Sequence, residues 1–244
     1  PQPQGHAMYE LFAYGDAGWG DEILRGLAIT AQLAIVTLPV GPALGFLAAF
    51  CSLSPLRTLR FFGFGYTTVM RGLPEILTLF VVYNGVGLLL NSALRWWNPD
   101  GGGTNFSPFA AGVIALGMVF GAFAGEVIRG AFNSLDRGQA EAGRAIGMSQ
   151  RKIFFRIQLP QLWRFALPGL GNLWINMLKD TALVSVIALD DLMRMTKVAV
   201  GVTKQPFTSY LVACLLYWVL CLLSQVVLAR MEKPANLCAT TPGI

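Results

Sequence analysis

Among the polar or charged residues within long apolar stretches of this chain, six are the first candidates for chemistry. They are Glu75, Asn84, Asn172, Asn176, Lys179 and Asp180. A charge at the centre of a bilayer costs about 2.5–3.5 kcal/mol on insertion scales, so such a residue is expected to face a cavity or a partner. Carboxylates with amide side chains around them suit the passage of a small cationic solute.

The spacing of three of these residues places them together. Asn172, Asn176 and Asp180 follow one another at intervals of four, so a helix carries them along one face. This face and Glu75 are predicted to line a translocation path, although hydrogen bonding between helices explains the same residues. Lys179 lies about 100° from Asp180 around a helix, so each of the two charges needs its own partner.

Pro74 precedes Glu75 directly and is predicted to kink the helix there, because proline has no backbone N–H and leaves a carbonyl free. Arg71 is expected near the cytoplasmic interface, where its long side chain could snorkel into water. We assign Arg71 a structural role. Pro74, Arg71 and Lys179 are therefore structural or gating candidates.

A second candidate region, residues 141–161, reads EAGRAIGMSQRKIFFRIQLPQ and carries three Arg and one Lys. Gln139–Ile146 is predicted to form a helix, and Gly147 to supply a turn at its end. Ser149 is a plausible N-cap for a second helix, Gln150–Gln158. Pro160 and Pro168 are then expected to keep the chain from running straight into the next apolar segment.

The composition identifies what must position these residues. The chain of 244 residues is 55% hydrophobic and only 13% charged, about half the charged share of a soluble domain. Its mean hydropathy is +0.56. Apolar stretches exceed the ~18 residues that cross a bilayer, and only helices satisfy their backbone there as single segments. We predict an all-α integral membrane protein with spans at about 27–50, 66–90, 109–128, 165–189 and 210–228.

The basic residues predict the orientation of the five spans. Eleven Lys and Arg fall on one side, and the positive-inside rule places that side in the cytoplasm. Five fall on the other side: Arg25, Arg95, Arg194, Lys197 and Lys204. The N-terminus is therefore expected outside and the C-terminus inside. The tail 1–23 is then periplasmic, the membrane domain covers 24–230, and the tail 231–244 is cytoplasmic.

Several function classes lack support in the residues. The net charge of +5 follows membrane orientation rather than a nucleic-acid site. The single His6 lies in the N-terminal tail, and no metal cluster or H-E-x-x-H pattern supports a membrane enzyme. No G-x-x-x-x-G-K-[ST] loop occurs, so ATP-driven work would need a partner. Small residues at Gly41/Gly45 and at Gly117/Gly121/Gly125 favour close helix packing inside the chain.

The segment 137–161 resembles the EAA loop of binding-protein-dependent ABC transporter permeases, which reads E-A-A, three residues, G, nine residues and I-x-L-P. The matching residues are Glu141, Ala142, Gly147, Ile157, Leu159 and Pro160, with Gly143 in place of the third-position Ala. Gly costs a helix interior roughly 0.5–1 kcal/mol relative to Ala, so Gly143 is expected to soften this helix slightly.

The resemblance extends over about residues 24–230. Residues 65–87 are similar to the R-G-x-P region of polar amino-acid permeases. Residues 126–142 match their E-x-x-R-G run, and residues 166–192 match their fourth span. Within that family the chain looks most like the Q-type subunit of histidine/lysine-arginine-ornithine and opine uptake systems.

This resemblance implies a multi-pass protein of the bacterial inner membrane with type I ABC permease architecture. It implies two ABC ATPase subunits that bind ATP and Mg, a periplasmic substrate-binding protein, and a permease partner, with a paralogue favoured over a second copy. The cytoplasmic loop would couple to the ATPases, with Glu141 as the expected contact. The permease itself would bind no cofactor and would not be an enzyme.

The outer loop after the fourth span contains Asp190, Asp191 and Arg194, which are candidates for contact with the binding protein. A solvated loop explains these charges equally well. A secondary transporter or channel for small polar solutes also fits intramembrane Lys and Asp. However, five spans leave no room for an even inverted repeat, and none is detectable.

Overall fold

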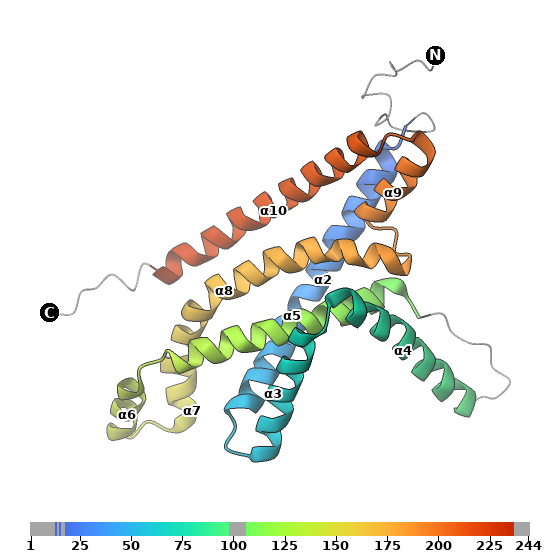
Figure 1. The fold of residues 1–244 in the computed structure, drawn as a ribbon. Helices are drawn as coiled ribbons and strands as arrows, with labels where there is room; N and C mark the ends of the chain where they lie inside the picture. Colours follow the sequence, from blue (N-terminus) through green and yellow to red (C-terminus); the bar gives the residue numbers. More distant parts are fainter. Residues whose placement is uncertain (1–12, 14, 16–17, 98–105, 237–244) are drawn as a thin grey trace, which may run out of the picture. The chain divides into compact units, whose positions relative to one another are not determined.

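The computed structural model describes residues 13, 15, 18–97 and 106–236, and the regular elements in these ranges are helical (Figure 1). Most of the expected N-terminal tail, with His6, lies outside the described residues. So do residues 98–105 of the loop after the second expected span and residues 237–244 of the expected C-terminal tail.

The chain divides into two compact units, and each takes segments from several long helices. Unit 1 consists of Pro1–Leu38, Pro74–Leu116 and Met177–Leu222. Unit 2 consists of Pro39–Leu73, Gly117–Asn176 and Leu223–Ile244.

Helix α2 (Gly20–Leu53) covers the first expected span and contains Pro39 and Pro42. Asp21 and Glu22 stand in its first turn, where carboxylates interact favourably with the helix dipole. The division between the units falls at Pro39, at which the helix lacks a backbone hydrogen bond. The fully buried Thr37 donates from its hydroxyl to the carbonyl of Leu33 at 2.7 Å and so satisfies its own polar group.

The second expected span, 66–90, is not one helix. The chain forms α3 (Arg57–Gly72) and α4 (Glu75–Trp97), with Leu73 and Pro74 between them. Leu73 is extended, at φ −92° and ψ 141°, because the ring of the following proline disfavours the helical region. The expected kink at Pro74 is therefore a complete break.

Helix α5 (Pro108–Asn133) covers the third expected span, and α6 (Arg137–Ala145) replaces the expected helix Gln139–Ile146. The next stretch is helical from Gln150 to Asp180 as α7 (Gln150–Ile153), a π-helical turn η1 (Phe154–Gln158) and α8 (Leu159–Asp180).

Pro160 and Pro168 do not separate the loop from the fourth span, contrary to expectation. Pro160 cannot donate to the carbonyl of Arg156, which an α-helix would require. The π-helical turn immediately before it shifts the bonding pattern, so that the N–H of Leu159 reaches the carbonyl of Phe154 five residues back. The helix thus passes Pro160 without ending.

The fourth expected span, 165–189, is regular only in its first part. Helix α8 ends at Asp180 and continues as a 3₁₀-helix, η2 (Thr181–Ile187), which Ala188 ends in the left-handed region at φ 64°. Helix α9 (Leu192–Thr203) follows, and α10 (Pro206–Asn236) covers the fifth expected span.

Four described helices are long and apolar enough to cross a membrane: Gly20–Leu53, Glu75–Leu94, Pro108–Asn133 and Pro206–Glu232. The segment expected as the fourth span is not among them. Its α-helical part begins with the polar stretch near Arg164 and carries Lys179 and Asp180 at its end.

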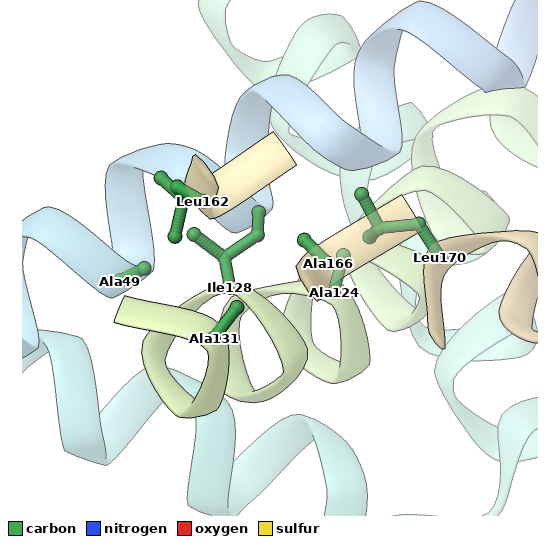
Figure 2. Close-up of a cluster of buried hydrophobic side chains, with 7 residues drawn as sticks. All are labelled: Ala49, Ala124, Ile128, Ala131, Leu162, Ala166 and Leu170. Carbon is green, nitrogen blue, oxygen red and sulfur yellow. The ribbon is translucent and has the colours of Figure 1, made fainter. Parts of the chain in front are cut away.

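Unit 2 has a core of small and branched side chains, shown in Figure 2. It comprises Ala49, Ala124, Ile128, Ala131, Leu162, Ala166 and Leu170, from α2, α5 and α8. Lipid is as apolar as these side chains, so close van der Waals contact holds such helices together. The alanines allow the helices to approach closely, and the larger side chains of Ile128 and Leu162 pack between them (Figure 2).

The two small-residue patterns pack against each other, which confirms their predicted role in internal packing. A Cβ on Gly45 would lie 2.7 Å from the Cβ of Ala124, and one on Gly121 would lie 2.7 Å from the Cβ of Leu44. Helix α3 also contacts α5 in this unit, where the Tyr66 hydroxyl of α3 donates to the carbonyl of Met118 at 2.6 Å. Larger residues at either glycine would force α2 and α5 apart.

Unit 1 joins α2 to α9 by an equally close contact. A Cβ on Gly26 would lie 2.9 Å from the carbonyl oxygen of Asp191. One turn further along α2, the hydroxyl of the fully buried Thr30 accepts from the N–H of Leu192 at 3.1 Å. The beginning of α9 is thereby fixed against α2.

Candidate functional site

Two acidic side chains meet in unit 1. Glu75 stands in the first turn of α4 and Asp180 is the last residue of α8. Their carboxyl groups lie within hydrogen-bonding reach of each other, and both residues are half-buried. Two carboxyl groups so close together attract a proton or a cation, because two negative charges repel at this distance. Of the predicted path residues, these two are brought together.

The acid pair lies where two helices are interrupted. Pro74 separates α3 from α4 directly before Glu75, and α8 changes to the 3₁₀-helix η2 directly after Asp180. Helix α4 also packs against η2. The C-terminal end of α8 adds the partial negative charge of its last carbonyls to the two carboxyl groups. In transporters, interrupted membrane helices commonly form the substrate and ion sites.

Lys179 does not enter this acid pair as a hydrogen-bonding partner. Its side chain is exposed, and it acts on Asp180 only through its charge. It also lies near Cys221 of α10. The expectation that Lys179 and Asp180 have separate surroundings is therefore consistent with the structure.

The three asparagines all lie at exposed positions. Asn84 is exposed and donates to the carbonyl of Phe80 within its own helix at 2.9 Å. Asn172 and Asn176 are exposed on the part of α8 that belongs to unit 2. Asn172 lines a shallow groove between α8 and α10, together with Gly171, Ile175, Gln225, Leu228, Ala229 and Glu232.

The predicted coupling loop has a well-defined turn in unit 2. Asp136 begins α6 as its N-cap, and its carboxylate accepts from the N–H of Gly138 at 2.8 Å. After α6, Gly147 lies at φ +80°, as predicted. The N–H of Met148 donates to the carbonyl of Gly143, and that of Gly147 to Arg144, both at 3.0 Å. These two bonds form a Schellman motif, which requires the left-handed glycine.

Gly143 proves to be a packing residue. It is buried, and a Cβ on it would lie 3.1 Å from Cγ1 of Ile153 and 3.3 Å from Cδ1 of Ile157. Its absence of a side chain thus lets α6 approach α7 and η1 closely. A second tie comes from Gln161, which donates to the side chain of Gln139 at 2.6 Å. This contact opposes the softening expected from the low helix propensity of glycine.

The coupling loop also presents exposed residues. Glu141, Ala142, Gly147 and Pro160 are exposed, whereas Ile157 and Leu159 are half-buried. Ile146, which the sequence interpretation did not single out, is 78% exposed next to the turn. Single exposed apolar side chains are common on protein surfaces, so Ile146 is accessible but does not by itself identify a docking surface.

The three candidates for contact with a binding protein differ in exposure. Asp190 is exposed and forms an ion pair with Arg194, with 2.9 Å between Oδ1 and Nε. Asp191 is fully buried and cannot meet another protein from this position, so that assignment is wrong for Asp191. Its carboxylate instead caps α9 by accepting from the N–H of Arg194 at 3.0 Å.

Burial raises the pKa of the Asp191 carboxyl to about 6, against the opposing effect of the Arg194 and Met193 backbone N–H groups and of the Lys197 charge. Asp191 lies outside the helices identified as long enough to span a membrane. Its role is therefore to fix the start of α9, and its protonation is sensitive to mildly acidic pH.

Sequence reasoning also missed a charged cluster in unit 2. Glu126 of α5 pairs with Arg129 one turn further along and with Arg71 at the end of α3. The sequence indicates a structural role for Arg71, and Glu126 and Arg129 belong to the run of residues 126–142. The E-x-x-R spacing was the signal, because residues three apart on a helix are neighbours.

Comparisons with known proteins show the same similarity along most of the chain. The family model described as "Binding-protein-dependent transport system inner membrane component" matches residues 41–234. The chain is 40% identical to the octopine transport system permease protein OccQ of Rhizobium radiobacter, covering 91% of this chain and 94% of that protein. It is 42% identical to the arginine ABC transporter permease protein ArtQ of Escherichia coli strain K12, covering 85% and 92%.

A solved structure shares the fold. It is described as "Crystal structure of an amino acid ABC transporter with histidines" and matches with a TM-score of 0.75 at 30% identity. The match covers 88% of this chain and 95% of that one.

Proposed function

Because this chain belongs to the family of binding-protein-dependent transport system inner membrane components, we propose that it is the permease subunit of an ABC importer for cationic amino acids or related opines. Such a subunit lies in the inner membrane and is not itself an enzyme. The substrate class is supported by the names of its relatives, which include arginine and octopine transport permeases.

The observation that supports a cationic substrate is the contact between Glu75 and Asp180, which lie at two helix interruptions. A guanidinium or ammonium group placed between two carboxyl groups is attracted by both and reduces the repulsion between them. We infer that this acid pair receives the cationic side chain of the substrate during translocation. Asn84, Asn172 and Asn176 then remain candidates for other parts of the path, and Lys179 for gating.

The coupling loop 137–161 is proposed as the contact to two ABC ATPase subunits, with ATP and Mg bound on those subunits. Support comes from the tight turn at Gly147, the close packing at Gly143 and the exposed Glu141 and Ile146. A segment that transmits force must be locally rigid and accessible, and this loop has both properties.

The remaining arrangement is proposed from the sequence. It comprises five membrane-spanning segments, N-terminus out and C-terminus in, with a paralogous permease as the favoured partner and a periplasmic binding protein. The exposed Asp190 and Arg194 stay candidates for contact with that protein, mainly through encounter rate and salt dependence.

The acid pair can be tested in proteoliposomes that contain the complete transporter, its binding protein and ATP. Glu75→Gln and Asp180→Asn each keep the side-chain shape and remove one charge. Each is expected to lower L-arginine uptake about ten-fold or more, corresponding to about 1.4 kcal/mol of lost stabilisation. Arg57→Gln is the control, because it removes an exposed charge that lies outside the pair and outside the proposed contact with the binding protein. Uptake equal to that of the unmodified protein in both variants would refute the proposed site.

A further inference from the structure

One carboxylate in unit 2 serves two guanidinium groups. Oε2 of Glu126 lies 3.6 Å from Nη1 of Arg71, and the same oxygen accepts from Nη2 of Arg129. The hydroxyl of Thr67 lies near Glu126 and donates to the carbonyl of Phe64 at 3.2 Å. Arg71 and Thr67 come from α3, whereas Glu126 and Arg129 come from α5, so the cluster joins the two helices.

Aromatic rings hold both guanidinium groups in defined positions. The Cζ atom of Arg71 lies 5.5 Å from the ring centroid of Phe123, and that of Arg129 lies 5.2 Å from the centroid of Phe64. A ring over one face of a guanidinium leaves its N–H edges available for planar, bidentate hydrogen bonds. The rings therefore orient the two arginines without using their donors.

The cluster carries a surplus positive charge. Glu126 can neutralise one arginine, and no other acid among the described residues forms an ion pair with Arg71 or Arg129. Nε of Arg129 is buried and has no hydrogen-bond partner. A buried donor without a partner is costly, and a surplus positive charge attracts an anion. One additional anion would balance both.

The two arginines remain accessible to such an anion. The side chain of Arg71 is 43% exposed and that of Arg129 is 30% exposed. Arginine rather than lysine at both positions favours a planar, two-oxygen ligand, because the guanidinium fork matches the geometry of a carboxylate.

We propose that Arg71 and Arg129 bind the α-carboxylate of the transported amino acid, and that Glu126 holds the two guanidinium groups in place. The inference rests on the proposed function, since it names a second contact for the same substrate class. Arg71 is then a substrate-binding residue and not only a structural one.

The test uses the purified permease–ATPase complex without the binding protein, so that only the permease can select the ligand. Thermal stabilisation is titrated with L-arginine and with L-argininamide, which has the same side chain but no carboxylate. The unmodified complex is expected to bind argininamide about ten-fold more weakly than arginine. Arg71→Gln is expected to weaken arginine binding about ten-fold and to remove the difference between the two ligands.

Two further variants make the result specific. Arg71→Lys keeps the charge and loses the planar fork, so it is expected to weaken arginine binding to an intermediate extent and also tests the site if Arg71→Gln does not assemble. Arg57→Gln removes an exposed charge from the same helix α3, outside the cluster, and is expected to change neither affinity.

Equal affinities for arginine and argininamide in the unmodified complex would overturn the inference. So would an affinity difference between the two ligands that is unchanged in both Arg71 variants. Absence of binding by either ligand would overturn it as well. None of these results decides the role of Glu75 and Asp180, which the uptake assay measures separately.

Discussion

At the scale of single residues, the same residue type serves different purposes according to its surroundings. Asp180 is half-buried and Asp190 is exposed, so both carboxyl groups can be reached from outside. Asp191, which follows Asp190 in the sequence, is fully buried. The enclosed carboxylate uses one oxygen to cap α9, and its other oxygen, Oδ2, has no hydrogen-bond partner. Burial thus separates a structural acid from two candidates for binding.

Asp191 predicts a pH dependence of stability. Its pKa of about 6 in the folded chain exceeds the ordinary value of 3.8, so the folded chain binds more protons between these pH values. The free energy of unfolding should therefore fall as the pH rises through this window and stay level above it. Each pKa unit between the folded and the unfolded chain corresponds to about 1.4 kcal/mol. The free energy of unfolding should therefore decrease by a few kcal/mol across the window.

Asp191→Asn should remove this slope while an amide oxygen still caps α9. Thermal unfolding of the detergent-solubilised complex between pH 4 and 7 measures the effect, with Asp190→Asn as the exposed control. A slope that persists unchanged in Asp191→Asn would assign the pH dependence to another group.

Ala188 and Lys204 predict a gain in stability on substitution by glycine. Both have positive φ, 64° and 58°, where a Cβ costs roughly 1–2 kcal/mol. Glycine removes this cost but loses about 0.5–1 kcal/mol through the freedom of the unfolded chain. Ala188→Gly and Lys204→Gly should each stabilise the protein by about 0.5–1 kcal/mol in thermal unfolding. Ala28→Gly, at an exposed site within α2, should instead destabilise it; a loss in all three variants would contradict the argument.

At the scale of elements, proline and glycine define where helices end, bend or approach. Pro74 ends one helix and starts another, whereas Pro160 lies within a continuous helix because a π-helical turn precedes it. The two glycines also have different roles. Gly147 is required by its positive φ angle, whereas Gly143 is required by the side chains packed against it.

The two glycines of the coupling loop predict different responses to alanine. Gly147→Ala places a Cβ at φ +80° and should destabilise the turn by about 1–2 kcal/mol. Gly143→Ala gains about 0.5–1 kcal/mol of helix propensity, which the shift demanded of Ile153 offsets. Its net effect is expected to be near zero. Hydrogen exchange of residues 137–161 measures both, with faster exchange only in Gly147→Ala; equal protection in the two variants would exclude a special role for the turn.

At the scale of the whole molecule, the proposed substrate contacts occur in both units, and the proposed coupling loop lies in one of them. The acid pair belongs to unit 1, whereas the coupling loop and the cluster of Arg71, Glu126 and Arg129 belong to unit 2. Substitutions in the coupling loop should affect the coupling to ATP hydrolysis, whereas substitutions at either proposed substrate contact should affect substrate binding.

Glu141 predicts a loss of coupling without a loss of fold. It is exposed on α6, so Glu141→Lys should leave the stability within about 0.5 kcal/mol of its original value. The stimulation of ATP hydrolysis by the loaded binding protein should fall about ten-fold, because a like charge now faces the ATPase surface that accepted an acid. ATPase assays in nanodiscs with a check of complex assembly measure this. Arg57→Glu is the charge-reversal control at an exposed residue outside the loop, and full stimulation in Glu141→Lys would remove Glu141 from the coupling contact.

The sequence alone was sufficient for properties that depend on local composition and spacing. Hydropathy predicts a membrane protein, Gly147 predicts its own turn, and the small-residue patterns of Gly45 and Gly121 predict close helix packing. These conclusions need no knowledge of distant residues, because lipid solvation and backbone sterics act within a few turns of chain. The family resemblance added the proposed partners and the coupling loop.

The tertiary structure decided which distant groups meet. It placed Glu75 beside Asp180, enclosed Asp191 and joined Arg71 to Glu126, although these groups are far apart in sequence or indistinguishable by residue type. It also turned the expected kink at Pro74 into a break and carried the helix past Pro160. Burial and long-range contact depend on the packing of all segments together, and a local pattern contains no information about the side chains that will surround it.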